Sequence, residues 1–353
     1  MQKSFKPFYS FLFMVKVALE SFGCAANKDN VRIIKGLLKN YDFVSSKDAE
    51  VVVINGCIVK NTTKSKLLDL IRDLKNKKII ITGCLPVLKK DILKIVDCAF
   101  ISSDNLFEIK GLVDNFSCKD VLGVKQIKLN VSKDREDDIE IMQISSGCIG
   151  SCTFCLVKLA KGDLFSYPED MILKHVQSLS SISLLHITSQ DNAAYGLDFG
   201  TYALVPLVRK IVYLRSDLKI KIGMMNPNHV VKILNDLIEL YKLDQIEKFL
   251  HIPLQSGSNK VLKEMGREYT REEFLEIVKR FREIEGMNIV TDVIVGYPTE
   301  TEEDFLETFS LIKLFDVVNI SKFSSHRGTK AHSLKQLSSE ITKERSRRIS
   351  RIL

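Results

Sequence analysis

The chain has 353 residues, of which 45% are hydrophobic and 27% charged, and its formal net charge is +8. This length suits two ordinary domains, and the composition is typical of a soluble globular protein. No apolar run reaches the about 20 residues that cross a bilayer, so we expect no membrane association. Residues 1–13 form an aromatic and basic extension without the apolar core of a signal peptide, and Met14 is an alternative start.

The charges are unevenly distributed along the chain. Basic residues exceed acidic ones in residues 14–133 and again in the tail 335–353, whereas acidic residues prevail in 134–334. A basic domain and a basic tail around an acidic centre favour a polyanionic partner such as nucleic acid. The alternative is a solvated lysine surface with no such partner.

The first part of the chain alternates apolar strands with amphipathic helices. Strands are expected at 15–19, 51–54, 79–82 and 98–101, and helices at 28–40, 64–74 and 106–113. Continuous β-branched strands between amphipathic helices predict a parallel sheet that is covered on both faces. We therefore expect a flavodoxin-like α/β domain over residues 14–130.

One cysteine follows each of the first three strands of this domain. Cys24, Cys57 and Cys84 are each preceded directly by glycine, which lets the backbone turn tightly and approach a bulky ligand. The carboxyl ends of parallel strands share one edge of a sheet, so these three thiols should meet there. They could hold a metal cluster, and the alternatives are buried thiols or a redox pair. Cys98 and Cys118 lack this context.

A second α/β region follows a polar linker at 131–138. Strands are expected at 139–144, 184–188, 219–223, 248–252, 289–295 and 317–322, and helices at 169–180, 201–214, 258–265, 271–284 and 302–315. Six such units are too few for a closed eight-fold barrel, so residues 134–334 are predicted to form a partial (β/α)6 barrel. Its reactive groups should lie at the carboxyl ends of the strands.

A second set of three cysteines directly follows the first strand of this barrel. Cys148, Cys152 and Cys155 have the spacing C-x3-C-x2-C. Three thiolates from one short loop can bind three irons of a [4Fe–4S] cluster and leave the fourth iron open to another ligand. A structural zinc site would need a fourth ligand, and the nearest candidate, His175, lies twenty residues further on in a predicted helix. In a chain of this size, such loop cysteines favour a reducing cytoplasm over disulfides.

Polar loops follow the later barrel strands, at 188–192, 226–228, 253–257 and 296–300. Hydroxyls, amides and carboxylates at one rim suit a ligand that carries ribose, amine and carboxylate groups. His251 is interpreted instead as a core or rim histidine, and Thr299 or Thr301 as the cap of the next helix. No phosphate-binding loop, nucleophile elbow or zinc-protease motif occurs in the sequence, so kinase, hydrolase and zinc-protease functions lack support.

These motifs together resemble the radical SAM superfamily and, within it, the methylthiotransferases that modify tRNA beside the anticodon. The resemblance covers residues 14 to about 350, and combining both cysteine sets makes it specific. The motifs that carry it are Ser21-Phe-Gly-Cys24-x-x-Asn27, Asn55-Gly-Cys57, Gly83-Cys-Leu-Pro86, Ser146-Gly-Cys148-x-x-x-Cys152-x-x-Cys155, Thr188-Ser-Gln-Asp191, Ile252-Pro-Leu-Gln-Ser-Gly-Ser258, Asp292-Val-Ile-Val-Gly-Tyr-Pro-Thr-Glu300 and Phe323-Ser-Ser-His-Arg-Gly-Thr329.

The stretch from Cys155 to Pro168, together with Ala194-Tyr-Gly196, resembles the archaeal and eukaryotic branch of these enzymes. That branch acts on N6-threonylcarbamoyladenosine at position 37 of tRNA. The branches that act on isopentenyladenosine in tRNA or on a ribosomal protein are the alternatives. The family also carries a C-terminal RNA-binding TRAM domain, which we expect to be absent here because the chain stops after the basic tail 335–353.

The resemblance implies two [4Fe–4S] clusters, S-adenosyl-L-methionine (SAM), and a radical transfer of a methylthio group to C2 of the adenine. Cys148, Cys152 and Cys155 would bind the cluster that cleaves SAM, and Cys24, Cys57 and Cys84 would bind the one that delivers sulfur. The candidate SAM contacts are Gln190, Asp191, Gln255, Ser256 and Glu300.

The implied partners are the tRNA anticodon loop, an electron-donor protein and a sulfur source, and the last two are not identified by the sequence. Two rival hypotheses are a radical SAM enzyme with one cluster and a non-catalytic RNA-binding metalloprotein.

Overall fold

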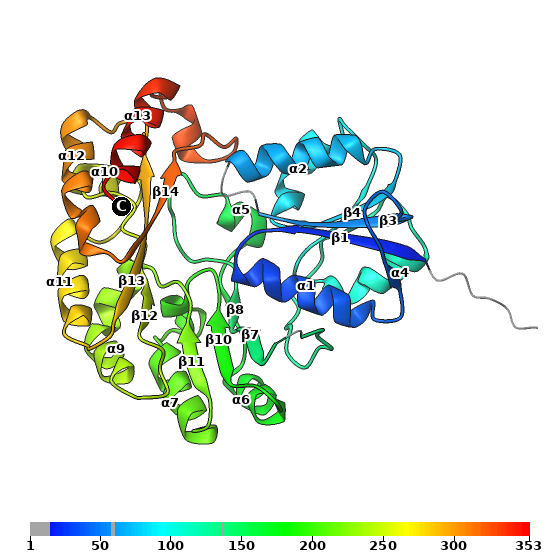
Figure 1. Ribbon diagram of the computed structural model, residues 1–353, viewed down its shortest axis with the longest axis horizontal. Coiled ribbons are helices and arrows are strands. Elements are labelled where there is room, and N and C mark those ends of the chain that lie inside the picture. The colour runs from blue at the N-terminus through cyan, green and yellow to red at the C-terminus, as the bar shows by residue number, and fades with distance from the viewer. Residues whose placement is uncertain (1–14, 58–60, 136) are drawn as a thin grey trace, which may run out of the picture.

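The computed structural model describes residues 15–57, 61–135 and 137–353, which form two α/β domains side by side (Figure 1). The predicted extension at residues 1–13 lies outside this range. Among the helices of the described ranges, none is long and apolar enough to cross a membrane.

The N-terminal domain contains one parallel six-stranded sheet, in the order β2-β1-β3-β4-β5-β6. Its strands are β1 (Lys16–Phe22), β2 (Asp42–Phe43), β3 (Val51–Gly56), β4 (Lys78–Gly83), β5 (Ala99–Ile101) and β6 (Asp120–Val121). The order of the first five strands is that of a flavodoxin-like sheet, as predicted. The two-residue edge strands β2 and β6 are too short to leave a hydrophobic pattern in the sequence, and they were not predicted.

Helices cover both faces of this sheet, as the buried strands require. They are α1 (Ala25–Leu37), α2 (Asn61–Asp73), α3 (Lys89–Ile92) and α4 (Ile109–Asp114), with the 3-10 turns η1 (Leu85–Leu88) and η2 (Leu106–Glu108). Val52 and Ile54 pack with Leu67 of α2 on one face. Val53 of the same strand packs with Ile34 of α1 on the other face.

The second domain is an open barrel of six parallel strands, which confirms the prediction. Its strands are β7 (Ile139–Gln143), β10 (Leu184–Thr188), β11 (Lys219–Ile222), β12 (Phe249–His251), β13 (Asn288–Val295) and β14 (Val317–Lys322). They form two three-stranded sheets, β11-β10-β7 and β12-β13-β14, which approach each other where Ile220 forms a bridge with Ile246. A short antiparallel pair, β8 (Ser145–Ser146) and β9 (Phe165–Ser166), was not predicted.

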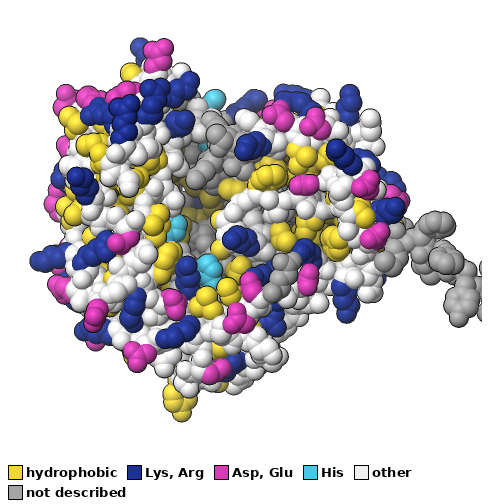
Figure 2. All heavy atoms as spheres, in the orientation of Figure 1, with side chains coloured by type: hydrophobic (Ala, Val, Ile, Leu, Met, Phe, Trp, Pro, Cys, Tyr) yellow, Lys and Arg dark blue, Asp and Glu magenta, His cyan; other side chains and the backbone are white. Residues whose placement is uncertain are grey.

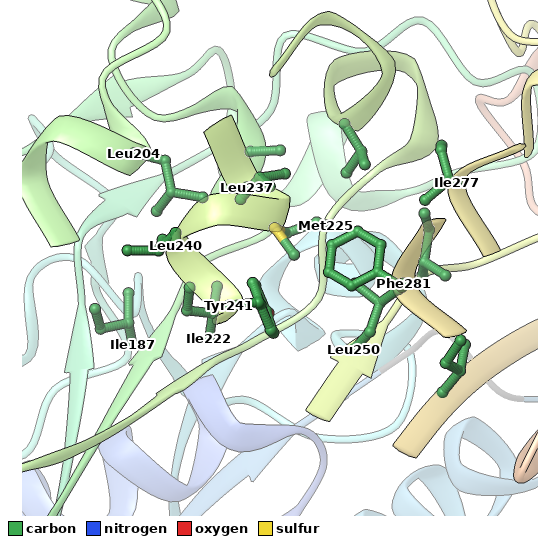
Figure 3. Close-up of a cluster of buried hydrophobic side chains, with 14 of the residues drawn as sticks. Ile187, Leu204, Ile222, Met225, Leu237, Leu240, Tyr241, Leu250, Ile277 and Phe281 are labelled. Atoms are coloured by element: carbon green, nitrogen blue, oxygen red, sulfur yellow. The ribbon is translucent and has the colours of Figure 1, made fainter. Parts of the chain in front are cut away.

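An outer layer of helices buries the convex side of this barrel. It comprises α6 (Glu169–Ser178), α7 (Leu204–Leu214), α8 (Pro227–Val230), α9 (Leu234–Tyr241), α10 (Asn259–Glu264), α11 (Arg271–Arg282), α12 (Glu302–Leu311) and the short turns η3 (Asn192–Ala194), η4 (Leu197–Phe199), η5 (Val231–Ile233) and η6 (Ile312–Leu314). The turn η7 (Lys330–Ser333) packs elsewhere, with Ala331 in one cluster with Phe154. Figure 3 shows Ile187 and Ile222 from the strands facing Leu204, Leu237 and Tyr241 from the helices.

Helix α12 begins at a capping box that also anchors the preceding loops. Thr301 is its N-cap, as predicted, and it exchanges hydrogen bonds with Asp304. Asp304 also accepts hydrogen bonds from Ser258 Oγ at 2.6 Å and from Lys260 Nζ at 2.8 Å. Burial alone would raise the pKa of this carboxyl, but these donors outweigh it and lower the pKa from 3.8 to about 2.

We expect Asp304→Asn to lower the free energy of unfolding at pH 7 by about 1–2 kcal/mol. Because the folded pKa lies below the unfolded value, the contribution of the carboxylate is present above about pH 4 and is lost as the pH falls toward 2. Urea unfolding of the wild type and the variant at pH 7 and pH 3 measures this difference. If the difference in unfolding free energy between the two proteins does not become smaller at pH 3, the carboxylate charge is not the source of that difference.

The tail 335–353 was predicted only as a basic segment, but most of it is helix α13 (Ser339–Ser350), docked on the barrel. Arg345 is 4% exposed and its Nη1 lies 2.5 Å from Glu300 Oε2. Arg348 pairs with Glu302 and lies 4.6 Å from the ring centre of Phe305. Two of the tail's cations are therefore bound by the protein itself.

The linker at 131–138 was predicted to separate the domains, whereas the structure uses it to join them. Lys133 lies with its Nζ 2.7 Å from Asp29 of α1 and 2.6 Å from Glu140 of β7. Arg32 of α1 pairs with Asp137 at 2.8 Å. The first helix of one domain is thus fixed against the first strand of the other.

Candidate active site

The loop that carries Cys148, Cys152 and Cys155 comes after β7, as predicted, and runs from the short strand β8 to helix α5 (Val157–Lys161), which was not predicted. Thr153, within this loop, anchors it to the barrel. Its backbone N–H donates to Met265 O at 3.0 Å, its carbonyl accepts from Ala331 N at 2.9 Å, and its Oγ1 lies 2.9 Å from Tyr297 Oη. The loop is therefore held in place by contacts that do not involve the thiols.

The three thiols of this loop lie close to one another. A Cβ atom at Gly150 would lie 3.3 Å from Cys148 Sγ and 3.9 Å from Cys152 Sγ, so both sulfurs face this glycine. Backbone N–H groups of Gly150 and Val157 donate to Cys148 Sγ and Cys155 Sγ, each at 3.3 Å. Burial raises the pKa of Cys155 to about 12, while the N–H group opposes it. Metal binding would have to displace the thiol protons.

The cysteine set fits an iron–sulfur cluster better than a single metal ion. The loop offers three thiols and no fourth Cys or His, which matches a cluster with one open iron and falls short of the four ligands of a structural zinc ion. In a cubane cluster each thiolate binds a different iron, which separates the sulfurs more widely than four ligands of one zinc. The N–H donors aimed at sulfur are also typical of cluster sites, where they adjust the reduction potential.

Gly266 and Arg267 complete the surroundings of this loop, and neither was predicted. Gly266 has φ +72°, and a Cβ there would meet Ser151 O at 3.1 Å, so a side chain would be strained. The guanidinium of Arg267 lies 5.6 Å from the ring centre of Phe154, and its buried Nε has no hydrogen-bond partner among the described residues. Burial opposes its charge, but the neighbouring groups Cys152, Tyr269, Cys155 and Asp191 together outweigh burial and raise its pKa. Nothing in the sequence distinguishes this arginine from surface ones.

Gln190 and Asp191 lie at the end of β10, as predicted. Asp191 Oδ1 accepts from Ala193 N at 3.1 Å and from Asn226 N at 3.0 Å, and its Oδ2 lies 3.7 Å from His229 Nε2. Burial raises the pKa of Asp191 despite these partners. The Oε1 atom of Gln190 is buried without a hydrogen-bond partner among the described residues, so it is available to a ligand.

The other three candidate SAM contacts differ in what they touch. Gln255 lines a pocket together with Cys155 and Asp292, and its φ of +64° is a strained value for this residue type. Ser256 is fully buried, with its Oγ 3.3 Å from Thr308 Oγ1. Glu300 accepts from Gly296 N at 2.7 Å and forms the ion pair with Arg345. Gln255 therefore faces the pocket, whereas Ser256 and Glu300 hold neighbouring segments together.

Cys24, Cys57 and Cys84 follow three adjacent strands whose ends are in register. Phe22 of β1 pairs with Gly56 of β3, which pairs with Gly83 of β4. The cysteines come one or two residues later, at the same edge of the sheet. Gly83 has φ +81°, and a Cβ there would lie 2.7 Å from Gly56 O, so glycine is required at this turn.

Two asparagines of the same motifs tie these turns together. Asn27 Nδ2 donates to Phe22 O at 3.0 Å, and Asn55 Nδ2 donates to Ser21 Oγ at 3.0 Å and to Asn27 O at 2.8 Å. Cys24 occupies the N-cap of α1.

The two cysteine loops face each other across the domain junction. Leu156, directly after Cys155, is buried in the core of the N-terminal domain beside Leu85, which directly follows Cys84. Lys161 Nζ of α5 lies 3.4 Å from Gly83 O and donates to Ser103 Oγ. Figure 1 shows α5 beside the starts of α1 and α2. Residues more than 60 positions apart in sequence are thus brought to one place.

The comparisons with known proteins match both domains. Residues 142–312 match the Radical SAM superfamily, and residues 16–100 match the uncharacterized protein family UPF0004. The probable threonylcarbamoyladenosine tRNA methylthiotransferase of Archaeoglobus fulgidus is 38% identical, over 96% of this chain and 83% of that protein. The chain belongs to the threonylcarbamoyladenosine tRNA methylthiotransferase family.

Membership of this methylthiotransferase family confirms the predicted resemblance and makes the chain an enzyme that uses SAM and a [4Fe–4S] cluster. The human threonylcarbamoyladenosine tRNA methylthiotransferase is 30% identical over 96% of this chain and 62% of that protein. Among solved structures, the radical SAM methyltransferase TsrM of Kitasatospora setae has a TM-score of 0.61 at 12% identity, covering 91% of this chain and 77% of TsrM. At this identity the likeness supports the fold alone.

Proposed function

We propose that the protein transfers a methylthio group to C2 of N6-threonylcarbamoyladenosine at position 37 of tRNA. The observation that carries the proposal is the meeting of two three-cysteine loops at the domain junction. A methylthiotransferase needs one site that activates the substrate carbon and another that supplies sulfur to it. The names of the archaeal and eukaryotic relatives support the choice of substrate.

We propose that Cys148, Cys152 and Cys155 hold the SAM-binding cluster and that Cys24, Cys57 and Cys84 hold a second [4Fe–4S] cluster. When bound, the first supplies the electron that cleaves SAM, and the second supplies sulfur. The protein's contribution is to keep the substrate carbon between both sites and to exclude water from the radical. Leu156 supports both roles, because it is buried in one cluster with Leu85 and so packs the two cysteine loops together.

Within this site, Gln190, Asp191 and Gln255 are proposed to contact SAM. Gln190 offers an unpaired buried oxygen, and Asp191 an oxygen with no hydrogen-bond partner among the described residues. Ser256 and Glu300 act on SAM indirectly, because they fix the loops after β12 and β13. Arg267 offsets the negative charge of the cluster thiolates.

We propose that tRNA binds over the hollow between the domains. Figure 2 shows a group of Lys and Arg side chains over α13, next to this hollow. Lys343, Arg347 and Arg351 are exposed there, and the N-terminal domain adds its surplus of lysines. Such contacts to phosphates would be salt-sensitive. Position 37 lies in a single-stranded loop, where a base can turn out into a pocket. A cytoplasmic location and a separate electron-donor protein are part of the same proposal.

The test is product formation by the anaerobically reconstituted protein with SAM, a reductant, sulfide and an anticodon stem-loop RNA. We expect the 2-methylthio derivative from RNA that carries N6-threonylcarbamoyladenosine, detected by mass spectrometry of the nucleosides. Product only from isopentenyladenosine RNA would assign the chain to the other branch. Formation of 5′-deoxyadenosine without either product would favour a single-cluster enzyme, and no SAM cleavage would favour an RNA-binding protein.

A further inference from the structure

The inner wall of the open barrel is polar where barrels are ordinarily apolar. Barrel interiors are usually filled by branched apolar side chains. Here His186 of β10 is in register with Lys221 of β11, so both side chains project from the same face. That face is the inner one, because Ile187 and Ile222, their neighbours in sequence, pack outward against the helices.

Helix α1 of the N-terminal domain adds further cations to this wall. Arg32 Nη1 donates to Ile139 O of β7 at 2.5 Å, and Lys28 precedes it by one helical turn on the same side. His186 lies among these groups. Its burial, and then the charges of Lys221, Lys28 and Arg32, lower its pKa to about 4, so the imidazole is neutral.

Two of these cations, Lys221 and Lys28, have no acidic partner among the described residues, whereas the other charged groups of the wall are paired. Arg32 is paired with Asp137 at 2.8 Å, and His251 further along the wall is hydrogen-bonded to Asp292 at 2.7 Å. Lys221 lies 3.8 Å from the ring centre of Phe249. Neither Lys221 nor Lys28 forms an ion pair with another described residue. Figure 2 shows histidine and basic side chains within the hollow between the domains.

We propose that Lys221 and Lys28 bind the carboxylate of the threonylcarbamoyl group, with His186 beside Lys221 on the same wall. This rests on the proposed function. In adenine, C2 and C6 lie on either side of N1, and the N6 substituent is attached at C6. When C2 faces the cysteine loops at the barrel rim, this substituent can therefore extend along the inner wall. Half-buried Lys221 has no anionic partner among the described residues, and a substrate carboxylate would supply one through a charge-assisted hydrogen bond.

The wall would also explain selectivity among modified adenosines. An isopentenyl group carries no charge and would leave Lys221 without an anion. A site built to bind a polar group rejects an analogue that lacks this group, so the isopentenyl substrate should be disfavoured. Lys221 and Lys28 are therefore specificity-determining residues, away from the cysteine loops where the transfer takes place.

Binding of anticodon stem-loop RNA to the reconstituted protein tests this assignment. Two RNAs of one sequence are compared, with N6-threonylcarbamoyladenosine or unmodified adenosine at position 37. We expect Lys221→Met to weaken binding of the modified RNA about tenfold, or about 1.4 kcal/mol, and to leave the unmodified RNA unaffected. Lys219→Met is the matched control, because Lys219 is on the same strand and donates instead to Asp244 O at 2.8 Å.

Each outcome decides the assignment. Equal weakening for both RNAs would mean that Lys221 binds a phosphate, and unchanged binding of the modified RNA would mean that it binds no anion; both overturn the inference. If Lys221→Met does not fold, Lys28→Met on the exposed start of α1 provides the same comparison. The proposed function fails separately, if the wild type forms no methylthio product from the modified RNA.

Discussion

Cys148→Ala/Cys152→Ala/Cys155→Ala is expected to abolish SAM cleavage and to lower the iron content from about eight to about four per chain. Each alanine removes one of the three thiols proposed to bind iron. The fold should persist, because Thr153 anchors this loop through Met265, Ala331 and Tyr297. Iron analysis, 5′-deoxyadenosine formation and circular dichroism measure the three expectations.

Cys118→Ala is the control for this variant. Cys118 is exposed and belongs to neither cysteine set, so its removal should change neither iron content nor SAM cleavage. If the triple variant still cleaved SAM at the wild-type rate, the open-iron site would lie elsewhere in the chain.

Lys133→Met is expected to lower the free energy of unfolding by about 3–5 kcal/mol, because it removes the cation that pairs with buried Asp29 and takes one partner from Glu140, which keeps Arg135 at 3.6 Å. The Lys133 side chain is 5% exposed, and those of Asp29 and Glu140 are 1% and 2% exposed. Burial opposes the charge of Lys133, but the two acids outweigh it and raise its pKa. Urea unfolding at pH 7 measures the loss.

Lys174→Met provides the comparison on the surface. Lys174 and Asp170 form an exposed pair at 3.3 Å on α6, and such pairs contribute less than about 0.5 kcal/mol. If Lys133→Met and Lys174→Met lower the free energy of unfolding equally, the linker does not join the domains through Lys133.

Much of the scaffold could be predicted from the sequence, because apolar patterns are set by burial. The strand at 184–188 and the strand at 317–322 were predicted with their observed bounds. Both cysteine sets were placed at strand ends by the same pattern. The docking of α13 was not predicted, because the buried Arg345 looks like any other residue of a basic tail.

The rest of the site depends on contacts between segments far apart in the chain. Arg267 approaches the cysteine loop only because Gly266 lets the backbone pass close to Ser151. Lys133 appeared to lie in a loose linker, and its burial follows from Asp29, about a hundred residues earlier. Local sequence patterns do not encode such pairings.

Iron and acid-labile sulfide per chain after anaerobic reconstitution, in the wild type and in Cys24→Ala/Cys57→Ala/Cys84→Ala, test the central claim most directly. Two cysteine sets that each hold a [4Fe–4S] cluster predict about eight irons in the wild type and about four in the variant. The variant should still cleave SAM but form no methylthio product. About four irons in both proteins would contradict the account, because the N-terminal cysteines would then bind no cluster.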